Sequence, residues 1–199
     1  SLGLLRQSVE RPPRSLTVAQ MTINVNIVPR AGTFSRSPSP HRVVALVYEG
    51  LCTFEFGIVV EMFGLPRPEM NPWYEFSVCG LKKRPVRAIG GITVAPAHGL
   101  QGLEHADTII IPGWPKPIAP PSAELVRALV RAHDRGARLV SLCVGSFVLA
   151  ETGLLNGRRA TTHWSFVDSM RKAFPLVRVE PDVLYLDEGD ILTSAGSAA

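Results

Sequence analysis

The stretch from Arg138 to Gly157 constrains the fold of this chain more than any other. An apolar, β-branched run ends in Cys143, and after Val144 and Gly145 the pattern is that of a helix. This order places a thiol at a sharp turn beside the positive end of a helix, where a thiolate is favoured. Gly145 permits a close approach that a β-carbon would block. The pattern predicts a functional nucleophile or, equally well, a small buried cysteine of a core strand.

The rest of the chain alternates buried strands with helices. Strands are expected at residues 42–48, 74–80, 106–113, 139–142, 177–180, 183–186 and 191–194. Helices are expected at 54–63, 122–135, from 146 onward and at 165–174, with N-caps at Thr53 and Ser122. This alternation predicts an α/β fold with a mostly parallel sheet, helices on both faces and a late antiparallel hairpin. We expect a flavodoxin-like three-layer sandwich with a cysteine elbow.

Residues 1–41 are expected to form a disordered, basic leader rich in proline and serine. The formal net charge of the chain is +4, and its first 42 residues hold six arginines and a single acidic residue. The remaining residues are therefore close to neutral, which argues against direct binding of nucleic acid by the globular part. We expect residues 42–199 to form one domain that is cut from something longer, because no helix follows the last strand to cover it.

Composition excludes several other classes of protein. No window approaches the roughly 18 uninterrupted apolar residues of a membrane span, and the first residues lack the apolar core of a secretory signal. The chain contains three cysteines without a C-x-x-C pair or a Cys/His cluster at metal-ligand spacing. We therefore expect a cytoplasmic protein with no metal, no cofactor and no membrane partner.

Four segments resemble the ThiJ/PfpI superfamily, which has the class I glutamine-amidotransferase-like fold with a cysteine at a strand-to-helix elbow. Within it, the chain is most similar to the amidase-like N-terminal domain of AraC-type transcriptional regulators, the FtrA-like activators. In that group a helix-turn-helix DNA-binding region follows, so DNA would be contacted only through a part absent from this chain. The matching segments are LCTFEFGIVVEMFGLPR (51–67), ADTIIIPGW (106–114), SLCVGSFVLAETGLLNGRRATTHW (141–164) and EPDVLYLDEGDILTSAGSAA (180–199).

The resemblance implies a set of site residues. The nucleophile position of the elbow falls on Cys143, and the acidic partner from the helix after the first strand falls on Glu55, whose alternative role is to complement its helix dipole. His163 matches a histidine near the elbow, although a lone histidine is more often structural. Two further pairs complete the set: Gly113 and Val144 as backbone donors of an oxyanion-hole type, and Trp114 and Trp164 as walls of the pocket.

Departures from the enzymes of the superfamily favour binding over catalysis. The PfpI-type hydrolases place a histidine directly after the cysteine, where this chain has Val144. A valine can neither deprotonate a thiol nor protonate a leaving group. The isonitrile hydratase-like members carry threonine at that position and aspartate in place of Glu55, and residues 170–199 lack the late histidine of the glutamine amidotransferases.

Three functions remain open from the sequence. The first is a sensor module that binds a small metabolite and acts as a homodimer within an AraC-type regulator. The second is a free-standing cysteine enzyme that uses Cys143 and Glu55, with His163 as the substitute base. The third is redox sensing by an elbow thiol of lowered pKa. The sequence leaves the ligand, the regulated genes, the dimer interface and the coding status of residues 1–20 undetermined.

Overall fold

A six-stranded sheet forms the centre of the domain in the computed structural model, which describes residues 39–70, 72–115 and 119–196. The strand order is β2-β1-β5-β6-β10-β9, and every neighbouring pair is parallel except β10 with β9. The strands are β1 (Arg42–Val47), β2 (Glu75–Gly80), β5 (Thr108–Pro112), β6 (Arg138–Leu142), β9 (Tyr185–Asp187) and β10 (Ile191–Ser194). The predicted leader falls almost wholly on residues 1–38, outside the described residues.

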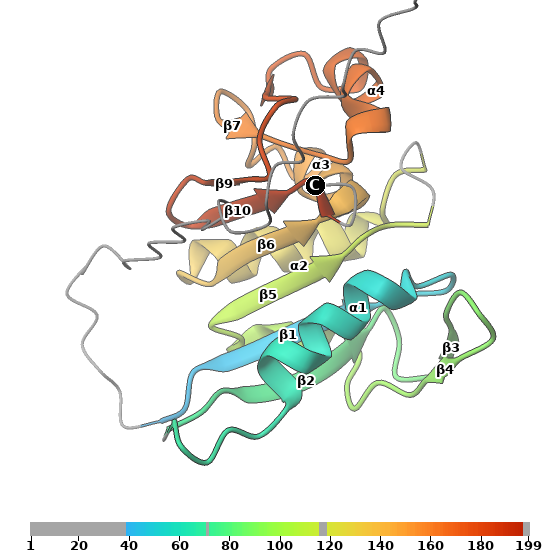
Figure 1. The fold of residues 1–199 in the computed structure, drawn as a ribbon, viewed down its shortest axis with the longest axis vertical. Helices are drawn as coiled ribbons and strands as arrows, with labels where there is room; N and C mark the ends of the chain where they lie inside the picture. Colours follow the sequence, from blue (N-terminus) through green and yellow to red (C-terminus); the bar gives the residue numbers. More distant parts are fainter. Residues whose placement is uncertain (1–38, 71, 116–118, 197–199) are drawn as a thin grey trace, which may run out of the picture. The chain divides into compact units, whose positions relative to one another are not determined.

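Helices cover both faces of this sheet, which confirms the predicted α/β architecture. On one face α1 (Thr53–Val59) packs through Val59 against Val43, Ala45 and Ile110. On the other face lie α2 (Ala123–Asp134) and α3 (Ser146–Glu151), whose buried side chains join those of the alternate strand positions, such as Leu46. Figure 1 shows α1 in front of the sheet and α2 behind it.

The helix after β1 differs from the predicted single α-helix over residues 54–63. Cys52, not Thr53, occupies its N-cap position, and the Thr53 hydroxyl donates instead to the carbonyl of Ile89. Beyond α1 the chain continues as a π-helix, η2 (Val60–Gly64), in which the Leu65 N–H donates to the carbonyl of Val60. The Ser122 hydroxyl caps α2 as predicted, because it accepts a hydrogen bond from the Leu125 N–H.

Two short strand pairs lie outside the central sheet. The antiparallel pair β3 (Val86–Arg87) and β4 (Thr93–Val94) forms a sheet of its own. Within the central sheet, β9 with β10 forms the predicted hairpin. The parallel pair β7 (Arg159–Ala160) and β8 (Arg178–Val179) flanks α4 (Val167–Ala173), where the sequence predicted strand 177–180. The short 3₁₀ helices are η3 (Leu100–His105), η4 (Cys143–Gly145) and η5 (Trp164–Phe166).

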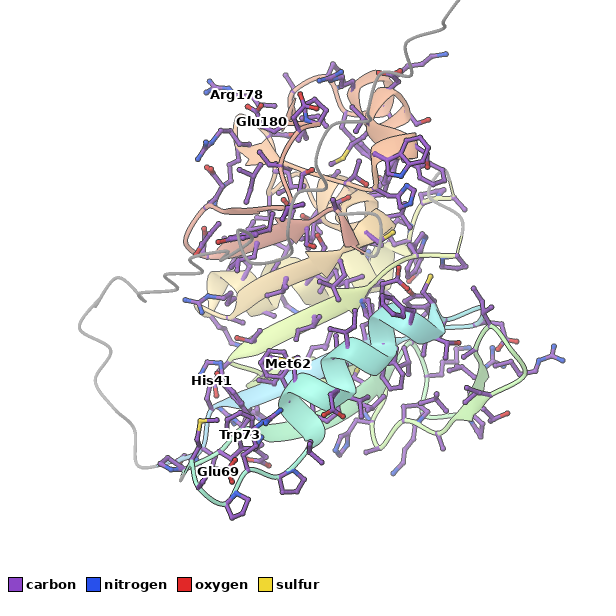
Figure 2. The ribbon with its side chains drawn as sticks, viewed as in Figure 1. His41, Met62, Glu69, Trp73, Arg178 and Glu180 are labelled. Carbon is purple, nitrogen blue, oxygen red and sulfur yellow. The ribbon has the colours of Figure 1, made fainter. Side chains whose placement is uncertain are left out.

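An aromatic cluster closes the end of the sheet where β1 begins. Tyr74 makes edge-to-face contacts with the rings of His41, Phe63 and Trp73, at centroid distances of 5.8, 5.0 and 4.9 Å. Figure 2 shows His41 and Trp73 at this end, with Arg178 and Glu180 at the opposite extreme of the domain. The aromatic cluster thus lies beside the amino ends of β1 and β2. Among the described helices, none combines the length and the apolar character needed to cross a bilayer.

Candidate functional site

Cys143 stands at a strained turn directly after β6. Its φ is +56°, and it is the one residue other than glycine with a positive φ in the described part of the chain. This conformation costs about 1–2 kcal/mol for a residue with a β-carbon. Two buried hydroxyls hold the turn: Ser146 and Thr162 both donate to the carbonyl of Cys143, at 3.2 and 3.4 Å. The elbow inferred from the sequence is therefore a real backbone feature.

Two glycines let the surrounding backbone close on this turn. A β-carbon on Gly145 would lie 2.5 Å from the carbonyl oxygen of Ile111, which is the approach that the sequence predicted. A β-carbon on Gly196, which follows β10, would lie 2.5 Å from the β-carbon of Cys143. The chain after β10 therefore packs on Cys143, and neither position accommodates a side chain without movement of the backbone.

Glu55 projects from α1 towards the elbow and is buried, with 7% of its surface exposed. The Cys143 thiol is hydrogen-bonded to this carboxylate. Burial first, and then the negative charge of Glu55, raise the pKa of Cys143 to about 12, although the Val144 N–H acts in the opposite direction. The expectation of a thiolate favoured by a helix end is therefore wrong, and redox sensing through a lowered pKa loses its basis.

Cys52 is a second thiol of this site, and the sequence reasoning missed it. It is half-buried at the start of α1, and its sulfur is hydrogen-bonded to the Tyr48 side chain and to the backbone of Trp114. Burial, followed by the charge of Glu55, raises the pKa of Cys52. The available signal was its position, because Cys52 lies between the first buried strand and the helix that follows it.

The strand order explains why these residues converge. From β1 the sheet grows towards β2 on one side and towards β5 and β6 on the other. The arrowheads of β5, β6 and β10 point to the same edge in Figure 1. In open parallel sheets, ligands bind outside the carboxyl ends of the strands where the order reverses. Cys52 and Gly113 follow the two strands that flank this reversal, so the site occupies the expected ligand position.

The backbone donors expected from Gly113 and Val144 have partners within the protein. The Gly113 N–H donates to the carbonyls of Ile111 and Leu142, both at 3.1 Å, so it is committed to the end of the β5–β6 pair. The Val144 N–H donates to the Cys143 sulfur. The next N–H after Gly113, that of Trp114, donates to the sulfur of Cys52. Each thiol therefore holds one backbone donor.

His163 and Trp164 lie beside the elbow but form a pair of their own. The His163 ring stacks on Trp164 at a centroid distance of 5.6 Å, and its Nδ1 accepts a hydrogen bond from the Ser165 N–H at 3.2 Å. The described groups that act on the Cys143 thiol are its own burial, Val144, Glu55 and Cys52, and His163 is not one of them. Trp164 is 67% exposed. The contacts that the structure gives for these two side chains are with each other and with Ser165 and Phe166.

Trp114, whose N–H contacts the Cys52 sulfur, also lines an open surface hollow of about 650 Å³. Its ring is buried, packs on Tyr48 at a centroid distance of 4.7 Å and donates through Nε1 to the carbonyl of Ala119. The described residues that line the cavity do not include Cys143 or Glu55. They are Glu49, Gly50, Arg87, Ala88, Ile89, Gly91, Trp114, Pro115, Ala119 and Pro120.

The described side chains of this site do not form a metal centre. Within residues 39–70, 72–115 and 119–196, no three histidine, cysteine, aspartate or glutamate side chains are arranged to hold a metal ion. What the site offers is two neutral thiols, one carboxylate and a neighbouring cavity with an aromatic wall.

The chain is similar in sequence to a known family and to several known proteins. The sequence profile described as the DJ-1/PfpI family matches residues 41–199. An uncharacterised protein from the cpoL 5′ region of Streptomyces lividans is 33% identical over 140 residues, which are 68% of this chain and 96% of that protein. The HTH-type transcriptional regulator CdhR of Pseudomonas aeruginosa is 33% identical over 154 residues, 77% of this chain and 46% of the regulator.

A solved structure described as an AraC family transcriptional regulator from Pseudomonas putida has the same fold. It superposes with a TM-score of 0.69 at 20% identity, over 79% of this chain and 84% of that chain. The match to CdhR, in contrast, leaves more than half of that regulator without a counterpart here, because this chain spans 46% of its length.

Proposed function

The chain belongs to the DJ-1/PfpI family, and from this premise we propose that it is the ligand-sensing part of an AraC-type transcriptional regulator. Its similarity to the HTH-type regulator CdhR supports this assignment, because the matched portion is the DJ-1/PfpI-like region. DNA is then contacted by a separate helix-turn-helix region of the longer protein. The near-neutral charge of the globular part agrees with DNA contact by a separate region.

The observation that carries the proposal is a nucleophile position whose neighbours keep the thiol protonated. Val144 follows Cys143, and the adjacent Glu55 carboxylate raises rather than lowers the pKa of the thiol. At neutral pH the Cys143 sulfur is a protonated, buried hydrogen-bonding group. Such a group binds a ligand well but attacks a carbonyl slowly, because the thiolate is the nucleophile.

Ligand binding at the switch point can alter the arrangement of the whole protein. A ligand shifts an equilibrium between two states only by its difference in affinity for them. We place the ligand beside Trp114, between the cavity and the two thiols, in a homodimer whose geometry sets the spacing of the DNA-binding units. A DNA-binding protein of this kind works in the cytoplasm, where its three free cysteines stay reduced.

The alternative is a cysteine enzyme acting on a C–N bond or a reactive carbonyl. The hydrogen bond between Cys143 and Glu55 favours it, since a carboxylate beside a thiol can take its proton when substrate arrives. An amide, isonitrile and α-oxoaldehyde panel tests this alternative. Turnover that iodoacetamide labelling of Cys143 abolishes would support an enzyme, and no turnover at high protein concentration would support the sensor.

Two further measurements test the sensor directly. The coding sequence beyond Ala199 is expected to encode a helix-turn-helix region, and a stop codon one helix later would contradict the regulator. A thermal-shift screen of small metabolites should identify a ligand whose stabilisation is lost in Glu55→Gln and kept in Glu61→Gln. Glu61 lies on the same helical segment but is exposed, so it is a matched control for the loss of charge.

A further inference from the structure

Three buried hydroxyls gather beneath the elbow, and the proposed function uses none of them. Ser141 of β6 is paired in register with Thr193 of β10, so their side chains stand side by side on the same face of the sheet. The N–H of Thr161, the residue after β7, donates to the Thr193 hydroxyl oxygen at 2.9 Å. Ser141 and Thr161 are 0% exposed and Thr193 is 2% exposed. Three separate chain segments thus meet around the Thr193 hydroxyl.

Two of these hydroxyls have no hydrogen-bond partner among the residues that the structure describes. They are the Oγ of Ser141 and the Oγ1 of Thr161. The Thr193 hydroxyl accepts one hydrogen bond and can also donate one. Burial of an unpaired hydroxyl is costly, and folded proteins pair the large majority of their buried polar side-chain atoms. The partner of this cluster must therefore be small and able both to donate and to accept.

The same layer of the core holds small side chains where the next layer holds large ones. Two residues earlier on the same two strands, Leu139 of β6 is paired with Ile191 of β10, and both are buried. Beneath the elbow Ser141 and Thr193 take the corresponding positions. Protein interiors are close-packed, so the volume that a serine and a threonine leave is filled. A water molecule, whose share of liquid volume is about 30 Å³, has a suitable size.

We propose that one buried water molecule binds between the hydroxyls of Ser141, Thr161 and Thr193. Buried waters typically make about three hydrogen bonds to polar groups, and this cluster supplies three hydroxyls, each able to donate or to accept. An ion fits less well, because three neutral hydroxyls do not offset the cost of burying its charge. This site does not depend on the proposed function, because it lies in the core and requires no ligand from solvent.

The three segments that bind the water also surround the elbow. The strand β6 leads directly into Cys143, and a β-carbon on Gly196, just beyond β10, would lie 2.5 Å from the Cys143 β-carbon. Thr162, the residue after Thr161, donates to the Cys143 carbonyl at 3.4 Å. A water that is bonded to all three segments therefore helps to hold the strained turn at Cys143 in place.

Single substitutions test the site through the sign of their effect on stability. Ser141→Ala and Thr161→Val each remove one hydroxyl with little change in size. Each leaves the bound water with one hydrogen bond fewer, so the folding equilibrium constant should fall roughly fivefold. Hydroxyls without a water would give the opposite sign, because their removal ends the cost of burying them unpaired.

Urea unfolding measures the folding constant of both variants. Thr93→Val is the matched control, because Thr93 is an exposed strand residue of β4, and its constant should change little. A fall in both variants supports the water site. A rise or no change in either variant would overturn it.

A direct measurement uses the unchanged 199-residue chain. A high-resolution crystal structure should show one water within about 3 Å of the Ser141 Oγ, the Thr161 Oγ1 and the Thr193 Oγ1. Side-chain rotamers that bond the Ser141 and Thr161 hydroxyls to protein groups instead, with no water between them, would overturn the proposal.

Discussion

Cys143 and Cys79 are both buried thiols whose pKa burial raises to about 12, yet their surroundings differ in kind. Cys79 lies in the regular strand β2, paired in register with Leu46 of β1, and its thiol donates to the Gly99 carbonyl at 2.8 Å. Cys143 has a positive φ, a carboxylate neighbour and a glycine packed on its β-carbon. Burial and acidity therefore do not distinguish the two cysteines, whereas backbone strain and chemical neighbours do.

The largest expected effect comes from the close approach beneath the elbow. Gly145→Ala should lower the free energy of unfolding by about 3 kcal/mol, because its β-carbon would lie 2.5 Å from the Ile111 carbonyl oxygen. Its φ of −59° suits alanine, so the cost is steric alone. Urea unfolding measures it, with Gly57→Ala in α1 as the control, since nothing lies within 4 Å of that site. The control, Gly57→Ala, should raise the free energy of unfolding by about 0.5–1 kcal/mol.

If Gly145→Ala left the free energy of unfolding unchanged, the turn at Cys143 would be no more tightly packed than an ordinary helix start. The contrast drawn between Cys143 and Cys79 would then be wrong. The loss should appear as a lower urea midpoint with an unchanged slope of the transition, since the denatured chains expose the same surface.

The next effect separates the two cysteines themselves. Cys79→Gly should destabilise by about 2–3 kcal/mol, because it adds a glycine to a strand and removes a buried side chain. Cys143→Gly should lower the free energy of unfolding by about 2 kcal/mol less than Cys79→Gly does. The reason is that glycine adopts the positive φ without strain, which offsets the lost burial of the side chain. Urea unfolding of both variants measures the difference. Equal losses would mean that the φ of +56° stores no strain.

A third effect concerns reactivity. Below its pKa of about 12, the Cys143 thiol is mostly protonated, so its alkylation by iodoacetamide should rise about tenfold per pH unit between pH 7 and 10. Glu55→Gln removes a charge that raises this pKa, so at pH 8 the variant should react about three- to tenfold faster at Cys143. Burial remains the largest cause, so the pKa stays above that of free cysteine.

Cys79 supplies the internal control for this measurement, because Glu55 does not appear among the groups that shift its pKa. Peptide mapping should show its labelling unchanged in Glu55→Gln and in the exposed control Glu61→Gln. Faster labelling at both cysteines would point to general loosening of the fold and would contradict a specific contact between Glu55 and Cys143.

Local patterns made the fold and the elbow predictable. The apolar run into Cys143, the glycine two residues later and the alternating strands and helices are properties of short segments, and the structure has them. The carboxylate beside Cys143 was reached through a family resemblance. Periodicity alone would place Glu55 only in the first turn of a helix.

What sequence reasoning missed depends on contacts between distant segments. Cys52 belongs to the site because the ends of β1, β5 and β6 meet at one edge of the sheet. No local motif around Cys52 indicates this. The direction of the Cys143 pKa was also missed, since a helix end of six residues is outweighed by burial and by a carboxylate from α1. The hydrogen bond from the Gly113 N–H to the Leu142 carbonyl likewise follows from the pairing of β5 with β6.

The smallest expected effect concerns the hydroxyls beneath the elbow. Ser146→Ala and Thr162→Val should each destabilise by about 1 kcal/mol, because each removes one of two donors to the Cys143 carbonyl. The double variant should lose more than the sum, since the carbonyl is then left without either hydroxyl. Urea unfolding measures the cycle. Additive losses would mean that the hydroxyls act independently, and the strained turn would then owe its stability to the glycines Gly145 and Gly196 instead.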